Sequence, residues 1–424
     1  MKIAVIGSGI AGNVAAYRLA ADHEITVYEA NRWPGGHTNT IDVEAEGRTL
    51  AVDTGFIVFN DRTYPNFIRL LDELGQASRD SDMSFSVHSR RTGLEYCGSS
   101  LNGLFADRRN LLRPAFHRMI RDILRFNREA LQSLQFEEPG QTVSGYLERH
   151  RYSSIFRDQY LVPMAAAIWS AEPVAIHEMP FTFLVQFFDN HGLLQLDDRP
   201  QWKTIVGGSK RYVEKLTRPY ASKIRLETPV QQVRRFQDHV EIYTASGGLE
   251  VYDAVFIACH SDQALQMLAD PTPSETAVLS AIEYQPNVAI LHTDERVLPK
   301  RRRAWAAWNY HLPERDRQHV AVTYNMNILQ GIEAKSQYLV TLNDDSAIEP
   351  GRVIRRVHYE HPIFSLDSVA AQARQREINV NRTFFCGAYW RHGFHEDGVV
   401  SALDALRHFE EKEASGQLHL RRAG

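Results

Sequence analysis

The sequence has few cysteines, no long apolar run and little net charge, and each of these features excludes a class of protein. Its 424 residues include three cysteines, Cys97, Cys259 and Cys386, which lie far apart without a CxxC pair. This spacing argues against a disulfide framework and a thiolate metal site. A formal net charge of −4 gives no overall reason to expect a nucleic-acid partner. No apolar run reaches the roughly 20 residues that a membrane-spanning helix needs.

These features predict a globular protein with reduced thiols in the cytoplasm. The first residues, MKIAVIGSG, carry one lysine and lead directly into an apolar strand, which differs from a secretory signal peptide. The composition, 43% hydrophobic and 24% charged, is ordinary for a globular chain. A length of 424 residues favours two closely packed domains.

The opening residues predict a strand–helix–strand unit that binds a dinucleotide. Between the apolar strand KIAVI and a helix over residues 10–21, GSGIAG places Gly7, Gly9 and Gly12 at the GxGxxG spacing. The first glycine permits the turn, the second admits a pyrophosphate and the third lets the helix approach the strand. Glu29 closes the second strand, EITVYE, where a carboxylate accepts a hydrogen bond from a ribose hydroxyl and disfavours the 2′-phosphate of NADP.

A second glycine pair, Gly35 and Gly36, follows in YEANRWPGGHTNT. NAD needs only the first turn, whereas an extended FAD molecule needs further close approach of backbone along its phosphates and ribityl chain. The pair either supplies this approach or forms a surface Pro-Gly-Gly turn.

The block E-A-N-R-W-P-G-G-H resembles the E-A-R-D-R-x-G-G-R block of the flavin-containing amine oxidase superfamily, which also holds phytoene desaturases and protoporphyrinogen oxidase. Glu29 and both glycines match, while the positions of three arginines carry Asn31, Trp33 and His37. VDTGF, residues 52–56, resembles the V-D-x-G-G stretch near the flavin, with Gly55 matched. The GGHTNT and GFHEDG blocks resemble most closely a bacterial branch that we associate with fatty-acyl modification.

The resemblance implies an α/β fold in which a Rossmann-like FAD-binding domain is combined with a discontinuous α+β substrate domain. The FAD-binding domain is predicted in residues 1–75, 200–268 and 376–424, and the substrate domain in residues 76–199 and 269–375. An antiparallel meander follows Thr228-Pro229-Val230, and the backbone of Val230 is expected to contact the adenine. His260, Ser261 and Asp262 are adjacent and so cannot form a catalytic triad; they are interpreted as the cap of the next helix.

The carboxyl-terminal segment, residues 383–406, predicts a buried strand, Gly387, a loop and a helix beginning near Gly398. In the family this helix points its amino terminus at the flavin pyrimidine, where free N–H groups and the helix dipole stabilise the reduced ring. We assign this contact to the N–H of Val399. Glu396 or Asp397 either bonds the ribityl chain or simply begins the helix.

Two further expectations concern the cofactor link and metals. Cys386 lies in the strand before Gly387, so a buried thiol and noncovalent FAD are predicted. HxxHE, residues 392–396, lacks the helical HExxH arrangement, so no metal site is predicted.

The substrate pocket is predicted to combine aromatic side chains from three segments. Trp169 comes from the first insertion, which is predicted to be helical, Trp308 and Tyr310 from a strand-rich second insertion, and Phe394 from the terminal loop. Amine oxidases generally place a lysine on a substrate-domain strand to hold a water at flavin N5, and the segment around Asn287 has none. This weakens the case for amine oxidation, whereas dehydrogenation of an apolar chain needs no such water.

We therefore expect an FAD-dependent oxidoreductase that transfers a hydride from an apolar substrate, a fatty-acyl or isoprenoid chain, to flavin N5. Oxygen or a quinone reoxidises the flavin, and no protein base is assigned. The alternatives are a flavin amine oxidase, a flavin-dependent double-bond isomerase, a flavin-binding protein without redox turnover, and an NAD dehydrogenase.

Residues 107–131 contain seven arginines at helical spacing among apolar residues. Such a basic amphipathic helix either lies on an anionic bilayer or packs one face on the core as an ordinary surface helix. The first interpretation predicts a cytoplasmic protein that is peripheral to the inner face of the membrane.

Overall fold

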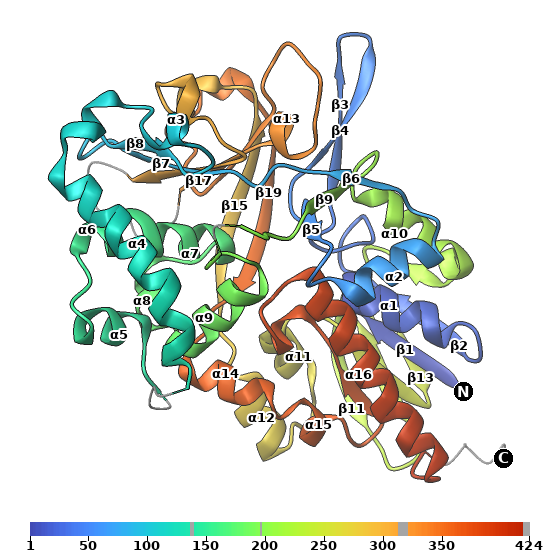
Figure 1. Cartoon of the computed structure of the whole chain (residues 1–424). Helices are drawn as coiled ribbons and strands as arrows, with labels where there is room; N and C mark the ends of the chain where they lie inside the picture. Colours follow the sequence, from blue (N-terminus) through green and yellow to red (C-terminus); the bar gives the residue numbers. More distant parts are fainter. Residues whose placement is uncertain (136–139, 196, 313–320, 419–424) are drawn as a thin grey trace.

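The computed structural model describes residues 1–135, 140–195, 197–312 and 321–418. Figure 1 shows two regions side by side, one containing α1 and α16 and the other containing the helices α4 to α9 beside a second sheet. Within the described residues, no helix combines the length and the apolar character that crossing a bilayer requires.

The first region is built on a parallel five-stranded sheet. In spatial order its strands are β10 (Ile224–Arg225), β2 (Glu24–Tyr28), β1 (Lys2–Ile6), β14 (Ala254–Ile257) and β20 (Thr383–Phe385). Continuous apolar runs such as those of β1 and β14 suit a parallel sheet that is covered on both faces. One face carries α1 (Ile10–Leu19) and α16 (His395–Ala414), which pack against each other. The α/β class and the first strand–helix–strand unit are confirmed.

The predicted meander lies beside this sheet. It consists of β11 (Val230–Arg235), β12 (Val240–Thr244) and β13 (Leu249–Tyr252), paired antiparallel. Further elements of this region are α2 (Pro65–Glu73), α10 (Lys210–Thr217), α11 (Ser261–Met267), the hairpin β3 (Thr40–Ala45) with β4 (Arg48–Asp53), and β5 (Val58–Asn60) with β9 (Trp202–Ile205) and β6 (Ser78–Asp80).

The second region has a seven-stranded sheet whose strands come from both predicted insertions. Their spatial order is β19 (Val353–Pro362), β15 (Tyr284–His292), β18 (Leu339–Leu342), β17 (Val322–Asn325), β16 (Trp308–Leu312), β7 (Phe85–Ser89) and β8 (Glu95–Cys97). The exact domain limits stay a prediction. The first insertion is not helical throughout, because β7 pairs parallel with β16 and antiparallel with β8. Because β16 lies far away in the sequence and β8 follows only after a turn, local periodicity does not reveal these pairings.

Helices cover this sheet. They are α3 (Leu101–Leu104), α4 (Pro114–Ser133), α5 (Val143–Arg149), α6 (Ser154–Phe156), α7 (Val162–Trp169), α8 (Pro173–Glu178) and α9 (Phe181–Asn190). The short helix α13 (Met326–Leu329) packs on β17 and β18, while α12 (Pro273–Leu279), α14 (Leu366–Gln372) and α15 (Gln375–Ile378) lie elsewhere. The apolar face of α4, with Phe116, Met119 and Phe126, is buried in the core. The helix therefore packs on the protein, and its apolar face is not available to lipid.

Asp53, at the end of β4, connects the two regions. Its buried carboxylate accepts hydrogen bonds from Thr40 Oγ1 at 2.5 Å and from Ser209 N at 2.9 Å and Oγ at 2.8 Å. Gln330, which follows α13 in the second region, donates Nε2 to the same carboxylate at 2.8 Å. Buried donors without a partner are costly, so this carboxylate stabilises the junction.

Replacing Asp53 with alanine leaves these donors without their acceptor. We expect Asp53→Ala to lower the free energy of unfolding by about 3 kcal/mol. The matched control is Asp80→Ala, which removes an exposed ion pair with Lys203 at 2.9 Å and should cost less than about 1 kcal/mol. Urea unfolding of both variants measures the difference, and equal effects would contradict the role given to Asp53.

Candidate active site

A cavity of about 1580 Å³ lies between the two regions. Its wall includes the turn after β1, most of residues 28–37, residues 54–58, one side of α11 and the part of β19 from Arg355 onward. Ordinary ligand pockets measure about 300–1,000 Å³. The cavity therefore has room for a dinucleotide and for a second molecule.

The glycine turn after β1 forms one end of the cavity. Gly7 has a φ of +94°, and a Cβ on Gly12 would lie 2.0 Å from the Gly7 carbonyl oxygen. A Cβ on Gly9, in contrast, would meet no atom within 4 Å, because Gly9 faces the open cavity at the start of α1. Backbone N–H groups at a helix start, next to open space, suit a pyrophosphate.

Glu29 is held at the end of β2 beside this turn. Its carboxylate accepts hydrogen bonds from Ser8 N at 3.0 Å, Ser8 Oγ at 2.5 Å and Asn31 N at 2.8 Å. Glu29 also lines the cavity. This is the geometry that a ribose-binding acid needs in a dinucleotide site.

The second glycine pair lies directly on the first turn. Gly35 N donates to Ser8 O at 2.8 Å, and a Cβ on Gly36, at a φ of +58°, would lie 3.1 Å from the Gly9 Cα. The alternative of a surface turn is therefore wrong. Gly55 makes a similar contact, because its Cβ would lie 2.1 Å from the carbonyl oxygen of His37.

The terminal helix α16 begins at His395, three residues earlier than predicted. Glu396 accepts hydrogen bonds from Asn66 and from Phe67 N at 2.9 Å, at the start of α2. Asp397 accepts from Phe394 N at 2.9 Å, and burial raises its pKa to about 7. Both acids thus act at helix starts, and neither faces the cavity.

The other predicted residues divide into two groups. Those that line the cavity are Gly7, Gly9, Glu29, Gly35, Gly36, His37, Gly55, Trp169, Val230, Trp308, Gly387 and Phe394. Those that lie outside its wall are Gly12, Tyr310, Glu396, Asp397, Gly398 and Val399. Gly12 and Gly398 act by close packing, since a Cβ on Gly398 would lie 2.6 Å from Ile10 Cγ2. Tyr310 is buried in the core of the second region.

Several cavity residues were missed by the sequence analysis. Tyr359 stacks on the ring of His37 with centroids 4.8 Å apart, and the ring centroid of His361 lies 5.2 Å from that of His37. His260 holds the N-cap position of α11 without a capping side-chain bond; its Nδ1 instead pairs with Glu360 at 3.3 Å. Tyr359 and His361 alternate along β19, and this period of two was the available signal.

A chain of amides fixes the tautomer of His361. The backbone N–H of Val288 donates to Asn343 Oδ1 at 2.8 Å, so Asn343 Nδ2 donates to Asn287 Oδ1 at 2.6 Å. Asn287 Nδ2 then donates to His361 Nδ1 at 2.8 Å, which leaves the proton of the neutral ring on Nε2. Burial lowers the pKa of His361 to about 4. At neutral pH His361 is therefore an uncharged N–H donor in the cavity wall.

Four buried polar atoms of the cavity wall have neither a hydrogen bond nor an ion pair among the described residues. They are His37 Nε2, Trp308 Nε1, Tyr389 Oη and His392 Nε2. Native proteins rarely leave such atoms unpaired without a ligand or water nearby. Together with the open face of Gly9, they fit a bound polar cofactor. No group of three or more described side chains is arranged to hold a metal ion.

The fold and this glycine cradle define the class of protein, a two-region protein that binds a dinucleotide. Residues 10–327 match the model of the flavin-containing amine oxidoreductase family. The chain belongs to this family and is a flavin-dependent oxidoreductase whose cofactor is FAD. No curated protein sequence matches it.

Solved structures with the same fold include enzymes of different activity. Cyclohexylamine oxidase from Brevibacterium oxydans IH-35A is 17% identical with a TM-score of 0.70, over 97% of this chain and 99% of that one. A putative protoporphyrinogen oxidase from Exiguobacterium sp. 255-15 is 17% identical with a TM-score of 0.68, over 97% and 99% of the two chains. The CLA-producing fatty acid isomerase from P. acnes is 14% identical with a TM-score of 0.66, over 96% and 98%.

The open face of Gly9 allows a sharp test of the cradle. Gly9→Val adds a side chain that meets no protein atom within 4 Å at its Cβ, so the fold should persist with a loss of at most about 1 kcal/mol at the N-cap. We expect visible flavin absorbance per protein to fall at least ten-fold while circular dichroism stays unchanged. Gly98→Ala, also in open space, is the control. Retention of flavin by the valine variant would place the pyrophosphate elsewhere.

The amide chain to His361 predicts a change of tautomer. In Asn287→Asp a carboxylate faces His361 Nδ1, so the proton should move to Nδ1 and the pKa of His361 should rise by more than one unit. Nitrogen NMR of histidine-labelled protein measures both changes. Asn379→Asp is the control, because Asn379 bonds His408 Nδ1 at 2.9 Å outside the cavity and should alter only that ring. An unchanged His361 signal would contradict the hydrogen-bond chain.

Proposed function

We propose that this protein dehydrogenates an apolar chain, and that the chain is a fatty-acyl group rather than an isoprenoid. The observation that carries the proposal is the character of the cavity wall, which is aromatic and nearly free of carboxylates on the described residues. We further propose that the glycine turns, Glu29, His37 and Val230 hold FAD, and that the remaining space receives the substrate.

Aromatic side chains from both insertions meet in the cavity wall. Phe394 stacks on Phe187 at 5.0 Å, and Phe364 stacks on Phe183 at 4.8 Å, so these rings are fixed. Trp169 is also fixed, since its Nε1 donates to His392 O at 3.0 Å. Rigid apolar walls exclude water and match a hydrocarbon chain.

The distribution of charge disfavours a cationic amine. Of the described residues that line the cavity, the carboxylates are Glu29 and Glu360. Glu29 is bonded to Ser8 and Asn31, and Glu360 pairs with His260. An ammonium group would thus find no free acid, and leaving a charge unpaired in such a site is costly.

Two arginines favour an acyl substrate over an isoprenoid. Arg355 and Arg356 on β19 are exposed and line the cavity, and neither has an ion pair with a described residue. Guanidinium groups bind carboxylates in a two-pronged geometry. A fatty acid would place its carboxylate at one of the two, since adjacent strand residues point to opposite faces, and its chain along the aromatic wall.

The cysteines support noncovalent FAD. Cys259 lines the cavity, but burial raises the pKa of its thiol to about 12, so little thiolate is present at neutral pH. Cys386 is fully buried in the core and does not line the cavity.

FAD supplies a hydride acceptor at N5 when it is bound. The substrate loses a hydride and a proton, and oxygen or a quinone takes the electrons from the reduced cofactor. The neutral His361 donates a hydrogen bond to a substrate oxygen or to water, and its low pKa and N–H orientation make it unsuitable as the base. We leave the proton acceptor unassigned. We also propose lipid metabolism at the cytoplasmic face of the membrane, with contact through the exposed arginines of residues 107–131, because the apolar face of α4 packs on the protein.

Anaerobic mixing tests this proposal. Holoprotein is mixed with detergent-solubilised fatty acids or phospholipids and, separately, with polyamines and aromatic amines. We expect a lipid, and no amine, to bleach the visible flavin absorbance. Bleaching by an amine alone would establish an amine oxidase, and a shifted double bond without net bleaching would establish the isomerase that one fold neighbour represents.

The two arginines have a test of their own. Arg355→Gln/Arg356→Gln should raise the free fatty acid concentration for half-maximal bleaching at least ten-fold, because the carboxylate loses its charged partners. Arg352→Gln is the control, since Arg352 pairs with Glu349 at 3.3 Å and does not line the cavity. An equal response of all variants would contradict carboxylate binding at this place.

A further inference from the structure

We propose that the outer end of the seven-stranded sheet carries a docking surface for an anionic lipid bilayer. It consists of three leucines and five cations and is called the Leu–Arg surface: Leu101, Leu111, Leu112, Arg108, Arg113, Lys300, Arg302 and Arg303. This proposal rests on the membrane contact included in the proposed function. It places that contact on the segments beside the helix α4 and not on the helix itself. Binding to vesicles tests it without any measurement of turnover.

The leucines are unusually exposed. Leu101 is 77%, Leu111 50% and Leu112 87% exposed. Single exposed apolar side chains are common on protein surfaces. Here Leu101 lies in α3, and Leu111 and Leu112 lie in η1 (Arg108–Leu112). Arg108 connects the two elements, because it donates hydrogen bonds to Asn102 Oδ1 at 2.6 Å and to Phe105 O at 3.1 Å. They therefore belong to one piece of surface.

The cations come from a second segment that packs on α3. This segment is η5 (Arg302–Ala304), and it follows Lys300 and Arg301. Arg303 and Lys300 have no side-chain partner among the described residues, and Arg302 lies over the ring of Trp305 at 5.1 Å. The exposed positive charge of η5 thus stands next to the leucines of α3.

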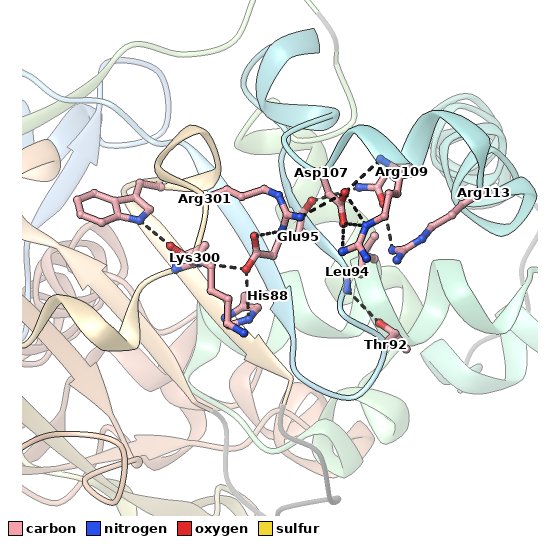
Figure 2. Close-up of polar contacts among 12 residues, drawn as sticks. His88, Thr92, Leu94, Glu95, Asp107, Arg109, Arg113, Lys300 and Arg301 are labelled. Carbon is pink, nitrogen blue, oxygen red and sulfur yellow. Dashed lines mark hydrogen bonds and ion pairs between the residues drawn. The ribbon is translucent and has the colours of Figure 1, made fainter.

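Two buried carboxylates hold these segments together, as Figure 2 shows. Arg301 pairs with Glu95 at 2.8 Å and with Asp107 at 3.4 Å, and Arg109 pairs with Asp107 at 2.9 Å. The backbone N–H of Lys300 also donates to Glu95 at 3.0 Å. The two anions neutralise Arg301 and Arg109 and leave the other cations of the surface in excess.

The combination fits a bilayer better than an acidic protein. A leucine that is almost completely exposed projects from the surface, and a fluid acyl layer accepts a projecting side chain without a matching pocket. Stable binding to a membrane takes two signals, and apolar insertion beside a basic cluster supplies both. Each cation near an anionic bilayer adds about five-fold in affinity. In Figure 1 α3 lies far from α1 and α16, so docking here leaves the dinucleotide region free.

Vesicle flotation of the full holoprotein tests the surface. We expect binding to vesicles of equal parts phosphatidylglycerol and phosphatidylcholine, weak binding to pure phosphatidylcholine, and a strong decrease with added salt. Leu111→Ser/Leu112→Ser and Arg302→Gln/Arg303→Gln should each reduce binding at least ten-fold while flavin content and melting temperature stay unchanged.

Two control variants make the result specific. Leu249→Ser removes a leucine that is 51% exposed on β13 in the other region and should leave binding unchanged. Arg121→Gln/Arg128→Gln lies farther along α4 and should cost less than the η5 variant. Loss of binding in the α4 variant alone, or no binding to anionic vesicles, would overturn the proposal. Salt-sensitive binding that does not depend on the leucines would also overturn it and would indicate electrostatic adsorption to the bilayer without insertion. The flavin-bleaching test with detergent-solubilised lipid does not depend on this surface, so the docking proposal and the proposed function can fail separately.

Discussion

Direct contact between backbones that are far apart in the sequence is the constraint on which the site depends. Gly36 packs tightly on Gly9, and Gly55 leaves no room for a Cβ against the carbonyl of His37. Within the first turn, Gly12 packs equally closely on the carbonyl of Gly7. These contacts bring the turn after β1, the Pro-Gly-Gly turn and the end of β4 together as one cradle. Any side chain at these positions would push the segments apart, so the geometry requires glycine there. The cavity in turn keeps its shape because these residues are glycines.

The same cavity is rich in histidines and yet carries little charge. Burial lowers the pKa of His361 to about 4 and of His395 to about 3, and it lowers the pKa of His37 as well. Each ring is therefore neutral at physiological pH and presents one donor and one acceptor. A wall of neutral rings can orient a polar group while it stays compatible with a hydrocarbon.

Sequence reasoning identified what local spacing determines and missed what pairing determines. Gly7, Gly9 and Glu29 follow from one strand–helix–strand unit, so their positions were predictable. His361 becomes a site residue only because β19 pairs with β15 and because Asn287 reaches its ring, and neither contact has a local signature. Tyr310 shows the opposite error, since alternation placed it beside Trp308 although the neighbouring core covers it.

Net charge does not describe the local charge of a surface, because buried anions allow cations to gather. The chain carries a formal charge of −4, yet Lys300 to Arg303 form a continuous basic run. Glu95 and Asp107 are almost fully buried, and their loss of hydration is compensated by Arg301 and Arg109. This pairing fixes η1 and η5 side by side, and the cations that remain outside have no acid to meet within the described chain. A surface of this kind is complementary to an anionic layer even when the net charge of the protein is negative. Salt screens each charge beyond a distance of about 10 Å, so the local charge decides the interaction.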